Sequence, residues 1–177
     1  VIRMNLPSPS EGRIKMEENL VTLKIDDKEV KVKQGTTILQ AAKQAGIDIP
    51  TLCFLKDINE VGDCRMCIVE VDGRKGFATS CIQKAEEGMV VHTHSPAVME
   101  ARRVILDLIL SNHHRDCLTC SRNGNCELQA LAMKFNVQHV EFEGEMTEHK
   151  VDDKSPAIMR DFNKCILCRR CVAACKN

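Results

Sequence analysis

Alternating apolar and polar positions mark the first structured part of the chain. The segment "LVTLKID" from Leu20 alternates with a period of two, "DDK" supplies a turn, and "EVKVK" alternates again, which predicts a β-hairpin. A second hairpin is predicted for "CIVEVDGRKGFATSC", with its turn at Asp72 and Gly73, and "MVVHTH" adds a further strand. Between the hairpins, "GTTILQAAKQAG" has capping-box spacing at Thr37 and Gln40 and predicts a short helix. We therefore expect a small mixed sheet with this helix packed on one face.

The pattern changes to a helical period at Ser95. Ser95 can cap a helix, and Pro96 suits its first position. Apolar residues then recur three and four positions apart, and the predicted buried stripe consists of Val98, Ala101, Ile105, Leu108 and Ile109. A second helix is predicted to start near Asn125, with a stripe of Leu128, Leu131, Ala132 and Phe135. Residues 140–156 are polar and weakly patterned, as in a connection.

These patterns predict an α+β chain in several parts. We expect a leader at residues 1–15, a sheet domain at 16–94, a helical domain at 95–139 and a cysteine-dense segment at 140–177. The chain begins with Val1, and Met16 opens the first patterned segment. The leader is therefore interpreted either as vector-derived or as a processed native extension.

Composition narrows the classes of protein that fit. Among 177 residues, 25 Lys and Arg balance 25 Asp and Glu, and Trp and Tyr are absent. Without a basic excess or stacking aromatics, nucleic acid is not an expected partner. Apolar runs such as "VILDLIL" are too short to span a bilayer, which takes about 20 apolar residues, and the start lacks a signal-peptide core. We expect a cytoplasmic protein without direct membrane insertion.

Cysteine is the chemically unusual component. The 11 cysteines are an odd number, whereas a disulfide framework normally pairs its cysteines and belongs to secreted chains. Metal ligation therefore fits better. The first set has the spacing C-x10-C-x2-C-x13-C and comprises Cys53, Cys64, Cys67 and Cys81. A [2Fe–2S] cluster needs four converging thiolates and N–H groups directed at sulfur, which Gly62 permits in this loop. Zinc is the alternative, although zinc sites usually present two close cysteine pairs.

The second set lies in "HHRDCLTCSRNGNC" and contains three cysteines, Cys117, Cys120 and Cys126. A histidine must complete any four-ligand site within this segment, and spacing leaves His113 and His114 as close competitors. Imidazole is neutral where thiolate is anionic, so such a cluster is easier to reduce, other things being equal. Zinc held by three thiolates and one imidazole remains an alternative for this motif taken alone.

The third set has the spacing C-x2-C-x2-C-x3-C and comprises Cys165, Cys168, Cys171 and Cys175. This spacing matches the [4Fe–4S]-binding run of bacterial ferredoxins, with Lys176 in place of the usual proline. In two-cluster ferredoxins the fourth cysteine ligates the other cluster, whose remaining ligands lie in a second run. No second run is present in these 177 residues. We therefore expect the chain to be part of a longer protein.

The order of the three sets is more specific than any one of them. Residues from about 17 to 177 resemble the N-terminal electron-transfer region of multi-cluster [FeFe] hydrogenases. NAD(P)-linked hydrogenase subunits, formate dehydrogenase alpha subunits and the large iron–sulfur subunit of respiratory complex I are similar. The resemblance implies a ferredoxin-like β-grasp domain with one [2Fe–2S] cluster, then a small helical [4Fe–4S] domain with one His and three Cys ligands. The first half of a ferredoxin-like module follows, so one or two [4Fe–4S] clusters are expected.

The resemblance also implies the ligands. Those of the [2Fe–2S] cluster would be Cys53, Cys64, Cys67 and Cys81. Those of the helical domain would be His113, selected over His114, with Cys117, Cys120 and Cys126. One cube would be held by Cys165, Cys168 and Cys171, and a second cube by Cys175. The spacing before Cys175 is closer to the hydrogenase and formate dehydrogenase forms than to complex I.

The expected function is the relay of single electrons. The partners would be a flavin-bearing, NAD(P)H-oxidising subunit or ferredoxin on one side and a downstream catalytic domain on the other, with an [FeFe] hydrogenase favoured. No residue pattern predicts a catalytic residue in this chain. The alternatives are the equivalent segment of a formate dehydrogenase or complex I subunit, a stand-alone carrier in which Cys175 closes its own cube, and a zinc-stabilised interaction scaffold.

Overall fold

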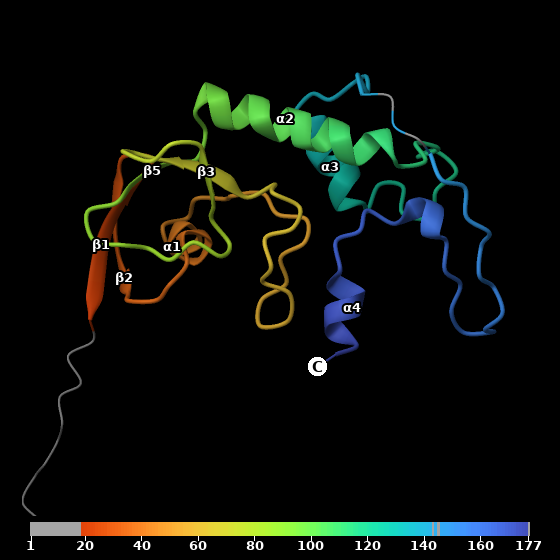
Figure 1. Ribbon diagram of the computed structural model, residues 1–177, viewed down its shortest axis with the longest axis horizontal. Helices are drawn as coiled ribbons and strands as arrows, with labels where there is room; N and C mark the ends of the chain where they lie inside the picture. The colour runs from red at the N-terminus through yellow and green to blue at the C-terminus, as the bar shows by residue number, and fades with distance from the viewer. Residues whose placement is uncertain (1–18, 143, 145, 177) are drawn as a thin grey trace, which may run out of the picture.

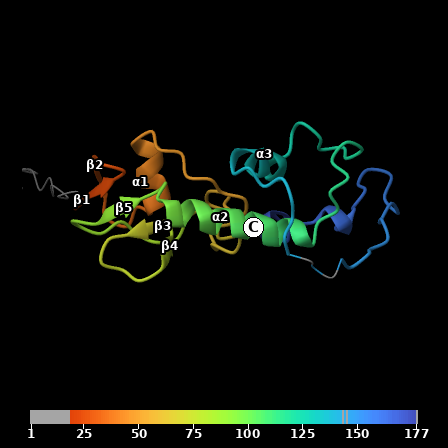
Figure 2. The same cartoon turned by 90° about the horizontal axis from the view of Figure 1, so that it is seen from above.

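The computed structural model describes residues 19–142, 144 and 146–176, so the predicted leader at residues 1–15 lies outside the described residues. A sheet occupies one end of the molecule and a group of short helices the other (Figure 1). The long helix α2 (Pro96–Ser111) runs between the two ends (Figure 2). None of the described helices is both long and apolar enough to cross a membrane.

The sheet has five strands: β1 (Leu20–Ile25), β2 (Lys28–Lys33), β3 (Ile68–Val71), β4 (Phe77–Thr79) and β5 (Val90–His92). Their order is β2-β1-β5-β3-β4. Both predicted hairpins are confirmed as antiparallel pairs, β1 with β2 and β3 with β4. β5 completes a mixed sheet because it runs parallel to β1 and antiparallel to β3. The period of two predicted the core correctly in the first hairpin, where Leu23, Ile25, Val30 and Val32 are buried.

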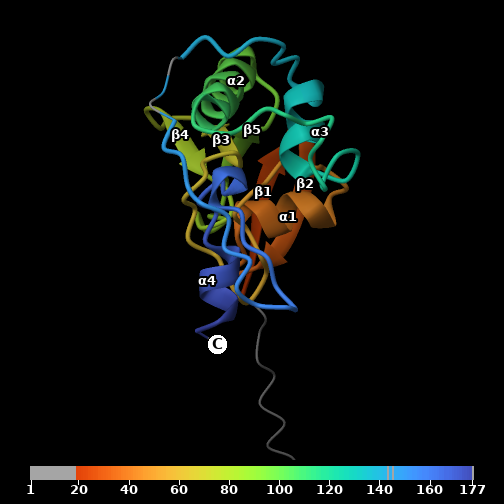
Figure 3. The same cartoon turned by 90° about the vertical axis from the view of Figure 1, so that its right-hand side faces the viewer.

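The helix α1 (Ile38–Gln44) lies against β1 and β2 (Figure 3). The predicted capping box is confirmed: the Thr37 hydroxyl accepts from the Gln40 N–H at 3.2 Å, and the Gln40 side chain accepts from the Thr37 N–H at 3.1 Å. At the other end, Gly46 has a φ of +73°. There the N–H of Gly46 donates to the Lys43 carbonyl and the N–H of Ile47 to the Ala42 carbonyl, which is a Schellman ending.

The buried line along α2 differs from the predicted stripe. The helix begins as predicted, with the Ser95 hydroxyl accepting from the Val98 N–H at 3.2 Å. Its buried residues, however, are Val98, Arg102, Leu106 and Asp107, whereas Leu108 is 52% exposed. The prediction for Leu108 was wrong because an arginine and an aspartate occupy the inner face. Both polar groups are satisfied there by backbone partners, while Ile105 and Ile109 of the predicted stripe are half-buried against the same core.

The helix α3 (Glu127–Lys134) packs on α2, and its Leu128 and the adjoining Phe135 are buried as predicted. Leu52 and Met66, from the loop that carries the first cysteine set, join these side chains and Leu106 in one core. The cysteine loop is therefore anchored between sheet and helices. The described residues of 140–156 contain no helix or strand, as predicted for a connection. Two short elements not expected from the sequence follow, the 3-10 helix η1 (Phe162–Lys164) and the helix α4 (Arg170–Ala174).

Candidate metal centres

The structure brings the first four cysteines together as two pairs. The Cys53 N–H donates to the Cys64 Sγ at 3.4 Å, and the Cys64 N–H donates to the Cys53 Sγ at 3.5 Å. The thiols of Cys67 and Cys81 are hydrogen-bonded to each other. Cys53, Cys67 and Cys81 are buried and Cys64 is half-buried. Four sulfurs therefore share one site that is largely protected from water.

Hydrogen bonds prepare one thiol of each pair for ionisation. The hydrogen bond from Cys53 lowers the pKa of Cys64 to about 5 against the effect of burial, helped by backbone N–H groups such as that of Met66. The hydrogen bond from Cys81 likewise lowers the pKa of Cys67 to about 7. The same two bonds, together with burial, raise the pKa of the donor thiols Cys53 and Cys81. Thiolate is the form of cysteine that binds metal, and N–H groups directed at sulfur stabilise it.

Two small residues shape this site. Gly62 has a φ of +70°, and a Cβ there would lie 3.1 Å from the Thr79 Cγ2 and 3.2 Å from the Ile82 Cδ1. Gly62 thus has the positive φ and the close packing that only a glycine allows without strain. Ser80 was not predicted: it is fully buried, and its hydroxyl donates to the Cys67 carbonyl at 2.7 Å. Its position directly before Cys81 was the only signal in the sequence.

The second set lines a small cavity of about 30 Å³. The residues around it include every candidate ligand of that set: His113, His114, Cys117, Cys120 and Cys126. Two buried ring nitrogens, Nδ1 of His113 and Nε2 of His114, have no hydrogen-bond partner among the described residues. Cys126 is the N-cap of α3, and its side chain makes no capping hydrogen bond. These free donor atoms around a cavity have the chemistry of a ligand set, and both histidines stay candidates.

The third set is more exposed than the other two. Cys165 follows η1, Cys171 lies in α4 and Cys175 ends it, and all three are exposed. Cys168 is half-buried, because this part of the chain approaches the first cysteine loop. No disulfide joins the four cysteines in the described structure.

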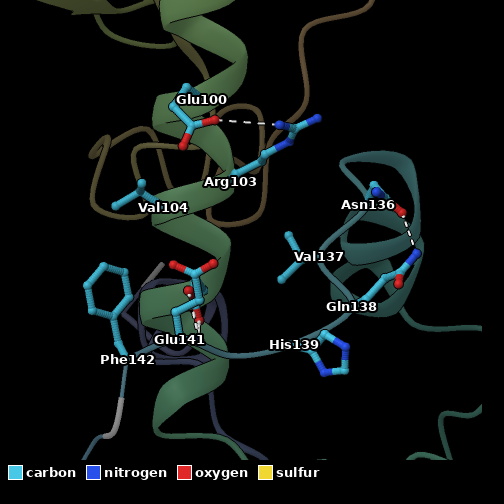
Figure 4. A pocket seen from close by; sticks show the side chains of 10 residues that line it. Glu100, Arg103, Val104, Asn136, Val137, Gln138, His139, Glu141 and Phe142 are labelled. Carbon is cyan, nitrogen blue, oxygen red and sulfur yellow. Dashed lines mark hydrogen bonds and ion pairs between the residues drawn. The ribbon is translucent and has the colours of Figure 1, made fainter.

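Two further features of the described residues bear on the kind of site, namely the grouping of metal-binding side chains and the largest-volume hollow among the pockets described. In the described residues, no three or more Cys, His, Asp or Glu side chains surround one point closely enough to hold a single metal ion. A binuclear core takes two thiolates at each iron, which the pairs Cys53–Cys64 and Cys67–Cys81 match. A hollow of about 380 Å³ lies between α2 and residues 136–142, lined by residues such as Glu100, Arg103 and His139 (Figure 4). None of the predicted ligands lines it.

Comparison with known families identifies the class of this protein. Residues 18–96 match the family described as "2Fe-2S iron-sulfur cluster binding domain". Residues 102–141 match the "NADH-ubiquinone oxidoreductase-G iron-sulfur binding region". The chain thus carries one [2Fe–2S] domain followed by a [4Fe–4S] region. The paired thiols of the first set and the histidine and cysteine donors of the second set match the ligand chemistry of these two kinds of cluster.

More particularly, the chain is similar to the iron–sulfur segments of NAD(P)-linked oxidoreductases. It is 45% identical over 162 residues to the NADP-reducing hydrogenase subunit HndD of Solidesulfovibrio fructosivorans, covering 89% of this chain and 28% of that protein. It is 38% identical over 159 residues to an NADH-quinone oxidoreductase subunit of Rhizobium meliloti, covering 89% of this chain and 19% of the relative.

A solved structure has the same fold. A chain of an NAD+-reducing [NiFe]-hydrogenase in the H2-reduced state superposes with a TM-score of 0.81 at 33% identity, covering 87% of this chain and 65% of that one. The predicted resemblance to NAD(P)-linked hydrogenases and complex I is therefore confirmed. Since the chain spans about a quarter or less of the curated relatives, their activities do not transfer with the match.

Proposed function

We propose that this chain is the electron-relay segment of an NAD(P)-linked hydrogenase, with a catalytic domain of the [FeFe] type. The observation that carries the proposal is the largely buried site of four thiols, with backbone N–H groups directed at the sulfurs of Cys53 and Cys64. A hydrogenase relative at 45% identity, against 38% for a quinone oxidoreductase relative, supports the hydrogenase branch. The proposed partners are a flavin-bearing, NAD(P)H-oxidising subunit or ferredoxin and the catalytic domain, in the cytoplasm.

The proposed ligands follow the three sets. A β-grasp domain would hold the [2Fe–2S] cluster through Cys53, Cys64, Cys67 and Cys81. The helical domain would hold a [4Fe–4S] cluster through His113, Cys117, Cys120 and Cys126. One cube would bind Cys165, Cys168 and Cys171, and Cys175 would serve its neighbour. Clusters of this kind supply one-electron chemistry, and the chain's own residues hold the sulfurs, exclude water and direct N–H groups at the thiolates.

Contacts between the three sets support a relay, because electron hopping requires neighbouring clusters. Three ion pairs link residues that are next to candidate ligands in the sequence. Lys164 pairs with Asp116, Arg169 with Asp63 at 3.3 Å, and Arg170 with Glu127 at 2.8 Å. These contacts connect the third set to the second through Asp116 and Glu127, and to the first through Asp63. The third set therefore lies beside both of the others.

Anaerobic reconstitution of the chain with iron and sulfide tests the clusters and their ligands. We expect about ten irons if three clusters close, or about six if the terminal site stays unfilled. We expect His113→Ala to lose about four irons relative to the parent chain and the matched control His114→Ala to lose none. Visible absorption should bleach on dithionite. Colourless, zinc-containing protein would reject the relay, and loss of iron only in His114→Ala would transfer the ligand role to that residue.

The gene sequence after residue 177 tests the parent reaction. A second C-x2-C-x2-C-x3-C run followed by a hydrogen-activating cluster site supports the hydrogenase assignment. A molybdopterin-binding domain would instead identify a formate dehydrogenase. A continuation like that of the NADH-quinone oxidoreductase relative would replace the hydrogenase proposal.

A further inference from the structure

Arg102 is the largest polar side chain that is completely buried in the described structure. It lies in α2, and its exposed fraction is 0%. Taking a guanidinium out of water costs several kcal/mol unless hydrogen bonds and opposite charge compensate it. The position therefore requires an explanation in terms of what surrounds the charge.

The guanidinium is satisfied by the backbone on either side of Cys67. Its Nε donates to the Met66 carbonyl at 3.1 Å, and one terminal nitrogen donates to the Ile68 carbonyl at 2.7 Å. The other terminal nitrogen donates to the Thr93 carbonyl at 3.0 Å. The helix α2 thus binds the carbonyl groups of the two residues on either side of the candidate ligand Cys67.

These three bonds give each guanidinium nitrogen one partner, and the Phe135 ring centroid lies 5.9 Å from the Arg102 Cζ, but no anion neutralises the charge directly. No carboxylate of the described residues forms an ion pair with Arg102. Burial lowers the pKa of Arg102 to about 10, while negative charge at Cys67, followed by Asp26 and Asp48, acts in the opposite direction. Arg102 is therefore protonated at neutral pH. The largest stabilisation of its charge comes from Cys67, one of the four thiols of the first set.

We propose that Arg102 is the buried counter-ion of the [2Fe–2S] cluster and raises its reduction potential. Reduction adds one negative charge to the cluster, and a fixed positive charge nearby stabilises the reduced form more than the oxidised form. Net charge and exposure are among the properties that set cluster potentials. The inference rests on the proposed [2Fe–2S] site and assigns it a residue outside its ligand loops.

A redox titration of the reconstituted chain, followed by the EPR signal of the reduced [2Fe–2S] cluster, tests this inference. We expect Arg102→Gln, which removes the charge and keeps an amide donor, to lower the ratio of reduced to oxidised cluster about tenfold at a fixed potential. A tenfold change corresponds to a shift of about 59 mV for a one-electron couple. Arg102→Lys keeps the charge and should stay within about twofold of the parent ratio.

Arg103→Gln is the matched control. Arg103 is the next residue of α2, but it lies beside the hollow of Figure 4, where it pairs with Glu100 at 3.5 Å and donates to the Phe135 carbonyl. Its replacement should leave the cluster ratio within about twofold of the parent value, because its charge is exposed and already paired. A shift as large as that of Arg102→Gln would show that any charge on α2 acts, and would overturn the specific role.

The remaining outcomes are also decisive. A folded, cluster-loaded Arg102→Gln with an unchanged potential would overturn the inference and leave only a structural link between domains. If Arg102→Gln fails to load while Arg102→Lys loads, the charge is what the site requires and the inference stands. If neither variant loads a cluster, the site requires the hydrogen-bond geometry of the guanidinium and not its charge, and the inference is wrong. Absence of any [2Fe–2S] signal in the parent chain would instead reject the proposed site.

Discussion

Gly62 shows at the scale of one residue how the cysteine loop excludes a side chain. Its φ of +70° lies in the left-handed region, which costs other residues about 1–2 kcal/mol. The missing Cβ also leaves room for Thr79 and Ile82 to pack close to the backbone. The loop that presents Cys64 therefore depends on glycine for its conformation and for its packing.

We predict that Gly62→Ala impairs the [2Fe–2S] site more than Gly88→Ala. Gly88 has a nearly identical φ of +72°, but nothing lies within 4 Å of its missing Cβ. Both variants should lose about 1–2 kcal/mol of stability from the backbone, and only Gly62→Ala should add a steric cost. Urea unfolding of the apo-chain and visible absorbance after reconstitution measure the two effects. Equal loss of cluster in both variants would contradict the role of close packing at Gly62.

The helix α2 is the element whose buried face the sequence pattern predicted only in part. The apolar count favoured Leu108, but the structure buries Leu106 completely. The inner line Val98, Arg102 and Leu106 follows a spacing of four, with an arginine at its centre. An arginine in an apolar line is normally assigned to solvent, and only the carbonyl groups it meets reverse that assignment.

We predict that Leu106→Ala costs about 3 kcal/mol of unfolding free energy, because it opens a cavity between α2 and α3. The matched change Leu108→Ala, on the same helix but 52% exposed, should cost less than about 1 kcal/mol. Urea denaturation of the two variants measures the difference. A larger loss in Leu108→Ala would mean that the stripe inferred from the sequence is the buried one.

At the scale of the whole molecule, Asn59 joins the first cysteine set to the third. Asn59 is 2% exposed, and its Nδ2 donates to the Cys53 carbonyl at 2.8 Å and to the Cys168 carbonyl at 3.1 Å. In Figure 1 the loop that follows α1 correspondingly lies beside α4. The buried amide of Asn59 thus joins Cys53 in its own loop to Cys168, which lies 109 positions after Asn59 in the chain.

We predict that Asn59→Ala loosens the third set from the first. Loss of a buried amide that serves two carbonyls costs about 1–3 kcal/mol, so backbone amides of residues 165–171 should exchange hydrogen about tenfold faster. Arg169→Gln removes only an exposed ion pair with Asp63 and should change exchange by less than about fivefold. Hydrogen-exchange mass spectrometry of both variants makes the comparison. Unchanged exchange in Asn59→Ala would show that other contacts hold the segment.

The sequence predicted what depends on near neighbours along the chain. The strands, the capping box at Thr37 and the N-cap at Ser95 follow from periods of two to four residues. The spacing of Cys53, Cys64, Cys67 and Cys81 indicated one shared site, and the structure gathers them. The residues it missed, Ser80, Arg102 and Asn59, act through backbone carbonyls, and a carbonyl carries no side-chain signature in the sequence.

The sequence by itself thus determined the local elements, the supply of sulfur and imidazole donors, and the class of chemistry they suit. Only the tertiary structure decided how the thiols pair, which face of α2 is buried and which side chains connect the cysteine sets. The physical reason is range: periodicity and capping act within a few residues, whereas burial depends on partners brought from distant parts of the chain. Arg102 and Asn59 are buried because carbonyl groups 6 to 109 residues away accept their hydrogen bonds there.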